Sequence, residues 1–319
     1  MRANGIQNLY KECRLCPRDC GVNRLQGERG YCGETARMRI AWAGLHLGEE
    51  PPLIGEKGSG TIFFSGCTLK CGSCQNCQLS SQGMGREVSA SDLESISLRL
   101  QERGAANINL VTASHFTPSM VESVARARSQ GLQIPVVWNS SGYEQVATLS
   151  LLGGSVDIYL PDCKTLDSEM SRSLMGAPDY PEVAKRALLK IVADKSLVVE
   201  HEQLRQGVVM RHLVLPGLLA QSREVLHWFA ANLKDRALLS LMFQYTPVAM
   251  GAARHGPHRT VSRREYQQVL AWLEELGIDD GFVQDPARND DWIPDFTRSN
   301  PFPEGQAVPV WHYETGYLE

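Results

Sequence analysis

Residues 61–76 read TIFFSGCTLKCGSCQN and place Cys67, Cys71 and Cys74 in the spacing CxxxCxxC. The apolar, β-prone run at residues 61–64 puts these cysteines on a loop that follows a strand. Thiolates are the preferred ligands of iron–sulfur clusters, and a short loop lets several sulfurs converge on one cluster. A cubane cluster has four irons, so three neighbouring cysteines leave one iron without a local protein ligand. The stretch therefore predicts a [4Fe-4S] cluster with one open iron.

The overall composition is that of an ordinary globular protein. The chain has 319 residues, of which 43% are hydrophobic and 21% charged, and its formal net charge is −4. This acidic balance argues against a nucleic-acid partner and against an anionic membrane surface. No apolar run approaches the roughly 20 residues that span a bilayer, and the N-terminus lacks the apolar core of a signal peptide. We therefore expect a cytoplasmic protein without nucleic-acid or membrane partners.

Eight of the nine cysteines lie within the first 77 residues, and Cys163 lies apart from them. A reducing cytosol favours metal or cluster ligation over disulfides. The first group consists of Cys13, Cys16, Cys20 and Cys32. A short CxxC loop with more distant cysteines suits a tetrahedral zinc ion, and it also suits a second iron–sulfur cluster. The spacing leaves zinc and an auxiliary cluster as alternatives.

Short apolar strands alternate with helices from residue 61 onward. Strands are expected at residues 61–64, 107–112, 134–138, 156–160, 208–215 and 238–243. Helices are expected at residues 89–103, 118–130, 143–152, 168–192 with a break near Pro178 and Pro181, 220–233 and 262–276. Such a series builds a parallel sheet covered by helices. Six βα units are too few for the usual eight-stranded closure, so we predict an α/β fold, a partial (β/α)6 TIM-like barrel.

Three regions follow from this pattern. Residues 1–57 form an N-terminal cysteine-rich segment for metal or cluster binding, with a short strand at residues 38–42, and residues 58–285 form the partial barrel. Residues 286–319 form an extended C-terminal tail rich in proline, acidic and aromatic residues. Such a tail is expected either to lie on the core through aromatic anchors or to bind a partner.

The three-cysteine loop after the first strand of a βα series resembles the radical S-adenosylmethionine (radical SAM) superfamily. Several stretches resemble, more narrowly, the subfamily related to pyruvate formate-lyase activating enzymes. They are residues 13–23 (CRLCPRDCGVN), 58–67 (GSGTIFFSGC), 107–112 (NINLVT), 157–162 (DIYLPD) and 211–217 (RHLVLPG). The resemblance covers roughly residues 10 to 285 and implies a [4Fe-4S] cluster on Cys67, Cys71 and Cys74, with SAM on the open iron.

The implied function is that of a radical SAM oxidoreductase, which cleaves SAM reductively to a 5′-deoxyadenosyl radical that abstracts hydrogen. Its implied partners are a flavodoxin- or ferredoxin-type electron donor and a protein substrate such as a glycyl radical enzyme. A radical SAM enzyme that modifies a small molecule or a peptide, with an auxiliary N-terminal cluster, is an alternative. A non-catalytic iron–sulfur or zinc protein for electron transfer, or an adaptor, is another.

The resemblance also suggests SAM contacts at the ends of the predicted strands, where active sites of βα folds lie. The candidates are Thr112, Ser114, His115, Asn139, Ser140, Asp162, Lys164, Arg211 and His212, with Gln244 as a further one. Thr112, Ser114 and His115 match by position a Gly-Gly-Glu loop of the relatives that is absent here.

Several of these candidates have a plainer alternative. His115 can be a surface loop histidine, Asn139 and Ser140 can belong to a turn, and Asp162 and Lys164 can simply pair with each other. Arg211 and His212 are neighbours within a strand, so we expect them on opposite faces of the sheet.

Two residues depart from the pattern of the relatives. Ser73 stands where the superfamily carries an aromatic residue, and Cys77 stands where the subfamily tends to carry one. Cys77 is either a fourth cluster ligand, which would close the cluster for plain electron transfer, or a buried thiol. Cys163 is expected to be a small core residue rather than a redox partner.

Overall fold

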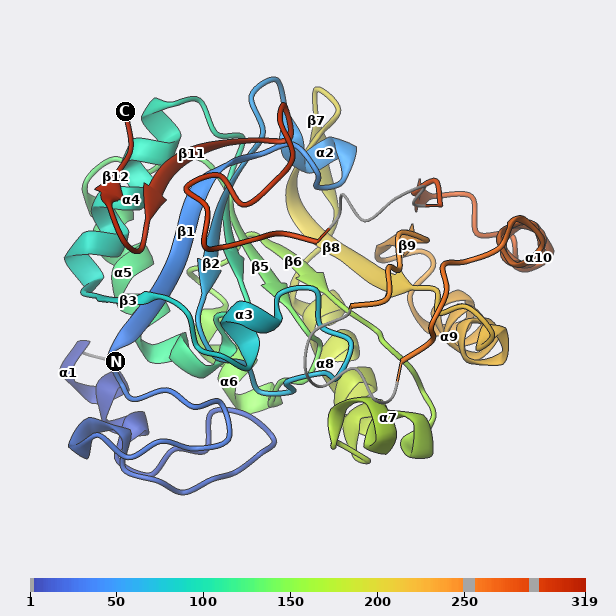
Figure 1. Cartoon of the computed structure of the whole chain (residues 1–319), viewed down its shortest axis with the longest axis horizontal. Helices are drawn as coiled ribbons and strands as arrows, with labels where there is room; N and C mark the ends of the chain where they lie inside the picture. Colours follow the sequence, from blue (N-terminus) through green and yellow to red (C-terminus); the bar gives the residue numbers. More distant parts are fainter. Residues whose placement is uncertain (1–2, 249–255, 287–292) are drawn as a thin grey trace.

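The computed structural model describes residues 3–248, 256–286 and 293–319. Its centre is a sheet with the strand order β10-β9-β8-β6-β5-β4-β2-β1-β11-β12, in which β3 also pairs with β1 and β7 with β8 (Figure 1). The strands are β1 (Met38–His46), β2 (Ser59–Phe64), β3 (Arg86–Val88), β4 (Ile108–Val111), β5 (Val136–Ser140), β6 (Ile158–Pro161), β7 (Val198–Glu200), β8 (Gln203–Leu213), β9 (Leu238–Met242), β10 (Gly281–Val283), β11 (Ala307–His312) and β12 (Gly316–Tyr317).

The helices lie between these strands. They are α1 (Ala3–Ile6), α2 (Pro51–Ile54), α3 (Cys77–Ser80), α4 (Ala90–Glu102), α5 (Thr117–Ser129), α6 (Val146–Leu152), α7 (Ser168–Met175), α8 (Tyr180–Asp194), α9 (Leu219–Asn232) and α10 (Arg263–Leu276), with 3-10 turns η1 (Gln7–Tyr10), η2 (Arg24–Gln26) and η3 (Ser114–Phe116). Within the described ranges, no helix is both long enough and apolar enough to cross a membrane.

The predicted partial barrel is confirmed. Strands β2, β4, β5, β6, β8 and β9 each run parallel to the next, and α4, α5, α6, α7 with α8, α9 and α10 follow them in turn. Strand β10 adds a further parallel pairing on β9 that the sequence did not predict, because three residues carry too little periodicity. The strand order begins at β10 and ends at β12, so the barrel is open.

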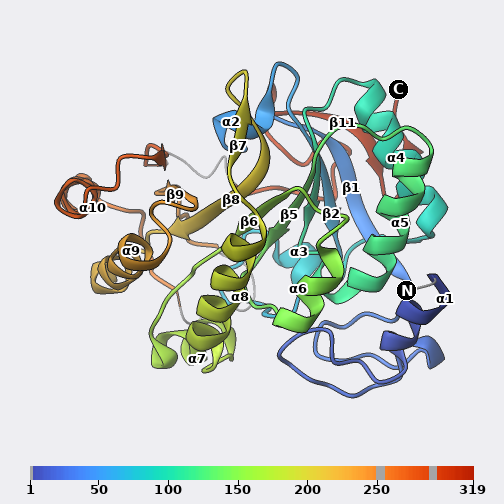
Figure 2. The same cartoon turned by 180° about the vertical axis from the view of Figure 1, so that it is seen from behind.

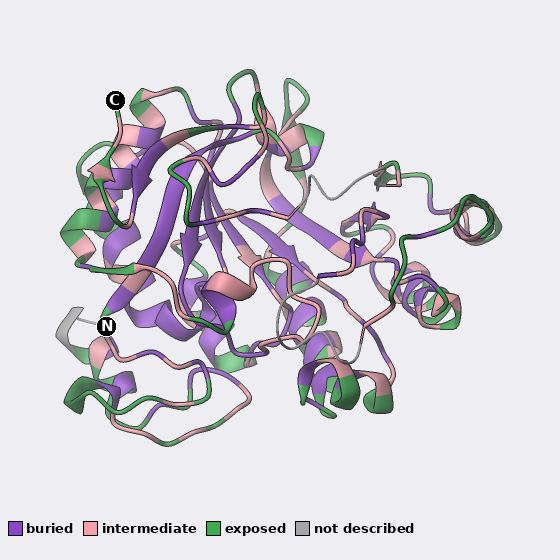
Figure 3. Cartoon of the chain, viewed as in Figure 1, coloured by how far each residue is buried: buried purple, intermediate pink, exposed green. Residues whose placement is uncertain are grey.

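Alternation along the strands gives the sheet two faces. Ile62, Leu110 and Trp138 belong to the large core that packs against the helices, and Figure 2 shows α4, α5, α6 and α8 covering this face. On the other face, Val137 and Val209 belong to a smaller inner core beneath α2. Figure 3 shows that the central strands are buried on both faces. Residues that follow this inner core, at the carboxyl ends of the strands, are therefore free to line a cavity.

Local capping explains where several helices begin. Ser89 and Asp92 form a capping box at the start of α4, and Ser262 and Glu265 form another at the start of α10. The long predicted helix is broken into α7 and α8 as expected. Helix α6 begins three residues later than predicted, at Val146, and the preceding Glu144 is instead buried in side-chain hydrogen bonds.

The C-terminal residues pack on the edge of the sheet. Strand β1 is longer than predicted and runs antiparallel to both β2 and β11. The ring centroids of Trp42 and Phe302 lie 5.3 Å apart, and those of Phe63 and Phe296 lie 5.2 Å apart. Aromatic packing of this kind adds to the free energy gained by burial. Residues 287–292 of the tail lie outside the described residues.

The N-terminal segment, residues 3–37, consists of short turns and irregular chain that precede β1 (blue in Figure 1). Its own apolar cluster is small and is formed by Tyr10, Cys13 and Leu15. Tyr10 also connects the segment to α5, because its hydroxyl lies 3.0 Å from the Ser119 hydroxyl.

Candidate functional site

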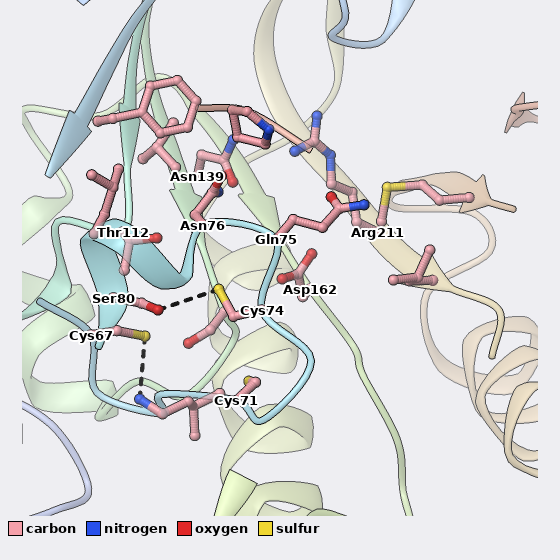
Figure 4. A pocket seen from close by; sticks show the side chains of 18 of the residues that line it. Cys67, Cys71, Cys74, Gln75, Asn76, Ser80, Thr112, Asn139, Asp162 and Arg211 are labelled. Atoms are coloured by element: carbon pink, nitrogen blue, oxygen red, sulfur yellow. Dashed lines mark hydrogen bonds between the residues drawn. The ribbon is translucent and has the colours of Figure 1, made fainter. Parts of the chain in front are cut away.

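A cavity of about 340 Å³ lies at the carboxyl ends of the parallel strands. Cys67, Cys71 and Cys74 line it (Figure 4), and all three belong to residues 66–76, which we call the three-cysteine loop. The strand ends contribute polar groups to the same wall, namely Thr112, Asn139, Ser140, Asp162, Lys164, Arg211 and Gln244. The fold therefore brings together the thiols and most of the polar candidates that the sequence suggested.

Hydrogen-bond donors and a cation surround the three thiols. The Leu69 amide donates to Cys67 Sγ at 3.4 Å, and the Ser80 hydroxyl donates to Cys74 Sγ at 3.4 Å. Burial raises the pKa of Cys71 to about 12, whereas the nearby Lys164 ammonium acts in the opposite direction. Burial likewise raises the pKa of Cys74 to about 11. Donors and positive charge stabilise thiolates, so this environment suits sulfur ligands of a metal centre.

The donor set fits a cluster better than a single ion. In the part of the chain that the structure describes, no three His, Cys, Asp or Glu side chains are arranged around one metal-ion position. The three thiols instead share the wall of one cavity. Cysteines of a cluster bind different irons and so need a common cavity rather than one point of convergence.

Glu144 organises the ends of β4 and β5. Its carboxylate accepts hydrogen bonds from Ser114 Oγ at 2.6 Å and from Trp138 Nε1 at 2.7 Å. It also accepts from Ser140 Oγ at 3.1 Å. Burial raises the pKa of Glu144, and these donors oppose the rise. Ser114 is therefore held by Glu144 and is absent from the cavity wall as described. Sequence reasoning missed Glu144, because in the sequence it is only an acidic residue early in a predicted helix.

Thr112 occupies a strained position on the cavity wall. Its φ of +61° is unusual for a β-branched residue, and its amide donates to the Asn139 carbonyl at 2.9 Å. Backbone strain of this kind persists only where the surroundings hold it, and it concentrates at functional sites. The strain marks the end of β4 as part of the site.

The two candidate histidines are buried away from the described cavity wall. His115 is not a surface residue, because its Nε2 hydrogen-bonds to the Ser65 carbonyl at 2.8 Å and burial lowers its pKa to about 3. His212 contacts the Cys163 carbonyl through Nδ1 at 2.7 Å and the Ser222 hydroxyl through Nε2 at 2.9 Å. Burial lowers the pKa of His212 to about 4. As alternation predicts, His212 packs on the helical side and Arg211 faces the cavity.

The charged residues of the cavity are paired within the protein. Lys164 Nζ lies 2.6 Å from Asp162 Oδ2, which is the ion pair that the sequence offered as an alternative. Arg211 Nε donates to Glu50 Oε1 at 2.7 Å, and its Nη2 donates to Glu49 and to Glu50. Burial would raise the pKa of Glu49, but Arg211 and then His46 lower it to about 2. Glu49 and Glu50 were missed because they are some 160 residues from Arg211 and no local pattern joins them.

The remaining cysteines are placed differently. Cys77 starts α3 and is half-buried, and it is not among the residues that line the described cavity. Cys163 is fully buried in the core beneath the helices. The cavity wall also includes residues that sequence reasoning missed, because they come from loops or from the distant tail: Gln75, Asn76, Gln284, Phe302 and Gln306.

Comparison with known proteins agrees with this site. Residues 55–166 match the family described as "4Fe-4S single cluster domain". The sequence is 30% identical over 280 residues to "Uncharacterized protein MJ0674" of Methanocaldococcus jannaschii. The aligned region covers 86% of this chain and 77% of that protein.

Two solved structures have a similar fold. A radical SAM methyltransferase from Sphaerobacter thermophilus matches with a TM-score of 0.50 and 16% identity, over 78% of this chain and 70% of that chain. SuiB of Streptococcus suis, bound to the precursor peptide SuiA, matches with a TM-score of 0.50 and 15% identity, over 70% of this chain and 47% of SuiB. The chain thus has the fold of radical SAM enzymes, and the matched cluster domain contains the three-cysteine loop.

Proposed function

Because the chain belongs to the family of the Methanocaldococcus jannaschii protein MJ0674 and has the radical SAM fold, we propose that it is a radical SAM enzyme. The observation that carries this proposal is the shared position of Cys67, Cys71 and Cys74 on one wall of a cavity at the carboxyl ends of parallel strands. Such strand ends are where βα folds place their reactive groups.

The three-cysteine loop would hold three irons of a [4Fe-4S] cluster through Cys67, Cys71 and Cys74. When bound, the cluster supplies the low-potential electron that cleaves SAM to methionine and a 5′-deoxyadenosyl radical, which then abstracts hydrogen. The hydroxyl of Thr112 and the side-chain amide of Asn139 line the cavity and are the groups proposed to hydrogen-bond the ribose and adenine, whereas the Ser140 hydroxyl donates to Glu144. The Asp162–Lys164 pair offers opposite charges for the ammonium and the carboxylate of SAM.

Apolar side chains form part of the cavity wall. Phe63, Val111 and Phe302 line it, and all three are buried. A radical that can attack unactivated carbon also attacks stray donors, so excluding other hydrogen sources protects the reaction. The aromatic wall therefore supports a radical function more than simple electron transfer.

We further propose that the hydrogen donor is a polypeptide, as in an activase of a glycyl radical enzyme. Support comes from the internal pairing of Arg211 with Glu49 and Glu50, since this leaves side-chain amides of the cavity lining, such as Gln75 and Gln306, rather than the Arg211 charge to recognise a substrate. SuiB, which shares the fold, binds a precursor peptide. A flavodoxin- or ferredoxin-type protein in the cytoplasm would supply the electron. A small-molecule substrate is the alternative.

The direct test is anaerobic reconstitution followed by reduction with dithionite in the presence of SAM. We expect release of 5′-deoxyadenosine and methionine in equal amounts. Cys71→Ala should abolish both the cluster and the products, whereas Cys163→Ala, a change at a core cysteine away from the cavity, should preserve them. A chain with full iron and sulfide that releases no 5′-deoxyadenosine would overturn the proposal. If SAM also leaves the EPR spectrum of the reduced cluster unchanged, the electron-transfer or adaptor alternative is favoured.

The polypeptide donor has a separate test. The reduced, SAM-loaded protein is mixed with a purified glycyl radical enzyme, and the mixture is examined by EPR for a carbon-centred radical on the added protein. A stable glycyl signal supports the activase function. Turnover of SAM that responds only to small molecules would support the alternative instead.

A further inference from the structure

The N-terminal segment packs directly against the three-cysteine loop. Gly66, which precedes Cys67, has a φ of +78°. A Cβ atom at Gly66 would lie 2.6 Å from Glu34 Cγ and 2.8 Å from the Cys32 carbonyl oxygen. Only glycine tolerates both that conformation and that close approach. The chain around Cys32 therefore lies in contact with the start of the loop.

Arg18, between Cys16 and Cys20, fixes the middle of the loop. Its Nε donates to the Thr68 carbonyl at 2.8 Å. The same guanidinium donates to the Gly176 carbonyl at 2.6 Å and to the Met175 carbonyl at 2.9 Å, at the end of α7. One side chain of the N-terminal segment thus joins the three-cysteine loop to the barrel. Such a planar, multidentate contact cannot be reproduced by lysine.

Tyr31, next to Cys32, fixes the following peptide. Its hydroxyl donates to the Leu69 carbonyl at 3.1 Å, and its ring lies 3.8 Å from the Arg18 guanidinium. Thr68 and Leu69 lie between Cys67 and Cys71, so two consecutive carbonyls of the loop are held by neighbours of N-terminal cysteines. A shift of those cysteines would therefore also shift the loop, because Arg18 and Tyr31 connect the two.

The four N-terminal cysteines are themselves gathered together. Backbone hydrogen bonds bring the first three close together, because the Gly21 amide, next to Cys20, donates to the Cys13 carbonyl at 3.0 Å and the Asp19 amide, also next to Cys20, donates to the Cys16 carbonyl at 3.1 Å. Two of the sulfurs accept hydrogen bonds, Cys13 Sγ from Arg24 Nη1 at 3.7 Å and Cys20 Sγ from the Tyr31 amide at 3.3 Å. The apolar cluster of the segment is small. Segments with so little core usually depend on a metal or a cross-link for their order.

We propose that Cys13, Cys16, Cys20 and Cys32 bind an all-thiolate metal centre, and that its occupancy holds the three-cysteine loop ready for its own cluster. Arg18 and Tyr31 are the positioning residues that carry this coupling. The inference rests on the proposed cluster at Cys67, Cys71 and Cys74, but it does not depend on SAM cleavage. In the described part of the chain no three His, Cys, Asp or Glu side chains surround one metal-ion position, so a second iron–sulfur cluster, whose irons are bound by separate thiolates, fits these cysteines better than a single zinc ion; the metal analysis below separates the two.

The test measures metal content and the rate at which an iron chelator removes iron from the anaerobically purified full chain. Arg18→Lys and Tyr31→Phe should retain the N-terminal centre but release iron from the loop cluster about tenfold faster, the loss typical of removing a group that orients a ligand. The matched control is Arg14→Lys, because Arg14 is exposed and its hydrogen bonds are to Glu12 and Asp19. Arg14→Lys should behave as the unaltered protein does.

A second arm removes the centre itself. The double variant Cys16→Ser, Cys32→Ser should lose the N-terminal metal and show the same rapid iron release. If it does not fold, Cys20→Ser replaces it, because Cys20 is the least buried of the four. One zinc ion per chain identifies a zinc site. Iron and sulfide beyond one [4Fe-4S] cluster identify a second cluster.

Three results would overturn the inference. They are an unaltered protein with no metal beyond the loop cluster, a folded cysteine variant with an unchanged iron-release rate, and an unchanged rate in both Arg18→Lys and Tyr31→Phe. Failure of the proposed function looks different. A protein that follows every expected release rate yet yields no 5′-deoxyadenosine would refute SAM cleavage and leave the coupling intact.

Discussion

The Lys164 ammonium lies 2.6 Å from the Asp162 carboxylate at the end of β6, and both side chains line the same cavity as Cys71 and Cys74. Burial would lower the pKa of Lys164, but the Asp162 charge and then Cys71 raise it, so Lys164 is a permanent cation beside the thiols. A fixed positive charge at this place favours the more negative, reduced form of a cluster.

We expect Lys164→Met to make the cluster harder to reduce, because the reduced state loses its nearby cation. The midpoint potential should fall by about 60 mV, the one-electron equivalent of roughly 1.4 kcal/mol. An EPR-monitored redox titration measures this value. Lys190→Met on the outer surface of α8, where Lys190 pairs with Asp194, is the matched control and should leave the potential unchanged. An equal potential for both variants would refute the assigned role of Lys164.

Glu144→Gln should destabilise the fold. The carboxylate accepts hydrogen bonds from Ser114, Trp138 and Ser140. The side-chain amide of glutamine would replace one acceptor oxygen by an NH2 group, which would then face one of these donors. We expect a loss of about 1–3 kcal/mol in the free energy of unfolding, measured by urea titration. Glu182→Gln, at an exposed ion pair with Lys185, should change stability by less than about 0.5 kcal/mol. Equal losses would contradict the buried network.

Acid should weaken the fold through His212. Burial lowers its pKa from 6.5 to about 4, so between these values the unfolded chain binds a proton that the folded chain excludes. The stabilisation is complete above about pH 6.5 and is lost as the pH falls toward 4, by about 3 kcal/mol in total.

The variant His212→Asn keeps a hydrogen-bonding side chain and removes this titration. Urea titrations at about pH 5 and about pH 7.5 should show a smaller acid loss in the variant than in the unaltered protein. The buried His115 acts in the same direction, so some acid sensitivity remains. The exposed His227→Asn should retain the full loss. If His212→Asn loses as much unfolding free energy at low pH as the unaltered protein does, then other groups control the acid sensitivity.

Phe302→Ala should both destabilise the protein and widen the cavity. Phe302 contacts Trp42 and Phe63, with centroid separations of 5.3 and 5.7 Å, and it lines the cavity. Removing a buried phenyl ring costs about 3–5 kcal/mol, and Phe302→Leu should cost less because it keeps most of the volume. Tyr317→Ala, at an exposed aromatic of the same tail, is the control. Urea unfolding separates these outcomes, and similar values for Phe302→Ala and Tyr317→Ala would contradict the packing.

The parallel sheet could be predicted because its signals are local. The apolar runs that became β4 and β6, and the caps at Ser89 and Ser262, are contained within a few residues each. The thiols of the site could be predicted in the same way, since one short loop carries Cys67, Cys71 and Cys74. What these patterns share is that no distant partner is needed to recognise them.

The rest depended on partners far apart in the chain. Arg211 meets Glu50 across 161 residues, and nothing in either neighbourhood specifies the other. Glu144 became visible only once Ser114 and Trp138 were brought beside it. The aromatic residues of the tail indicated anchors, but not that β11 would extend the sheet through β1. Periodicity specifies which face of a strand is buried, and it does not specify its neighbour.

The wall that Phe302 and Gln306 add to the cavity has a consequence for biosynthesis. A ribosome makes the thiols of residues 67–74 long before it makes these two residues. A nascent chain halted before residue 302 would therefore present its three-cysteine loop beside an incomplete wall, open to water and oxidants. The wall around the thiols is thus completed only after these two residues have been made, and the machinery that delivers iron and sulfide meets either an incomplete wall or a complete one.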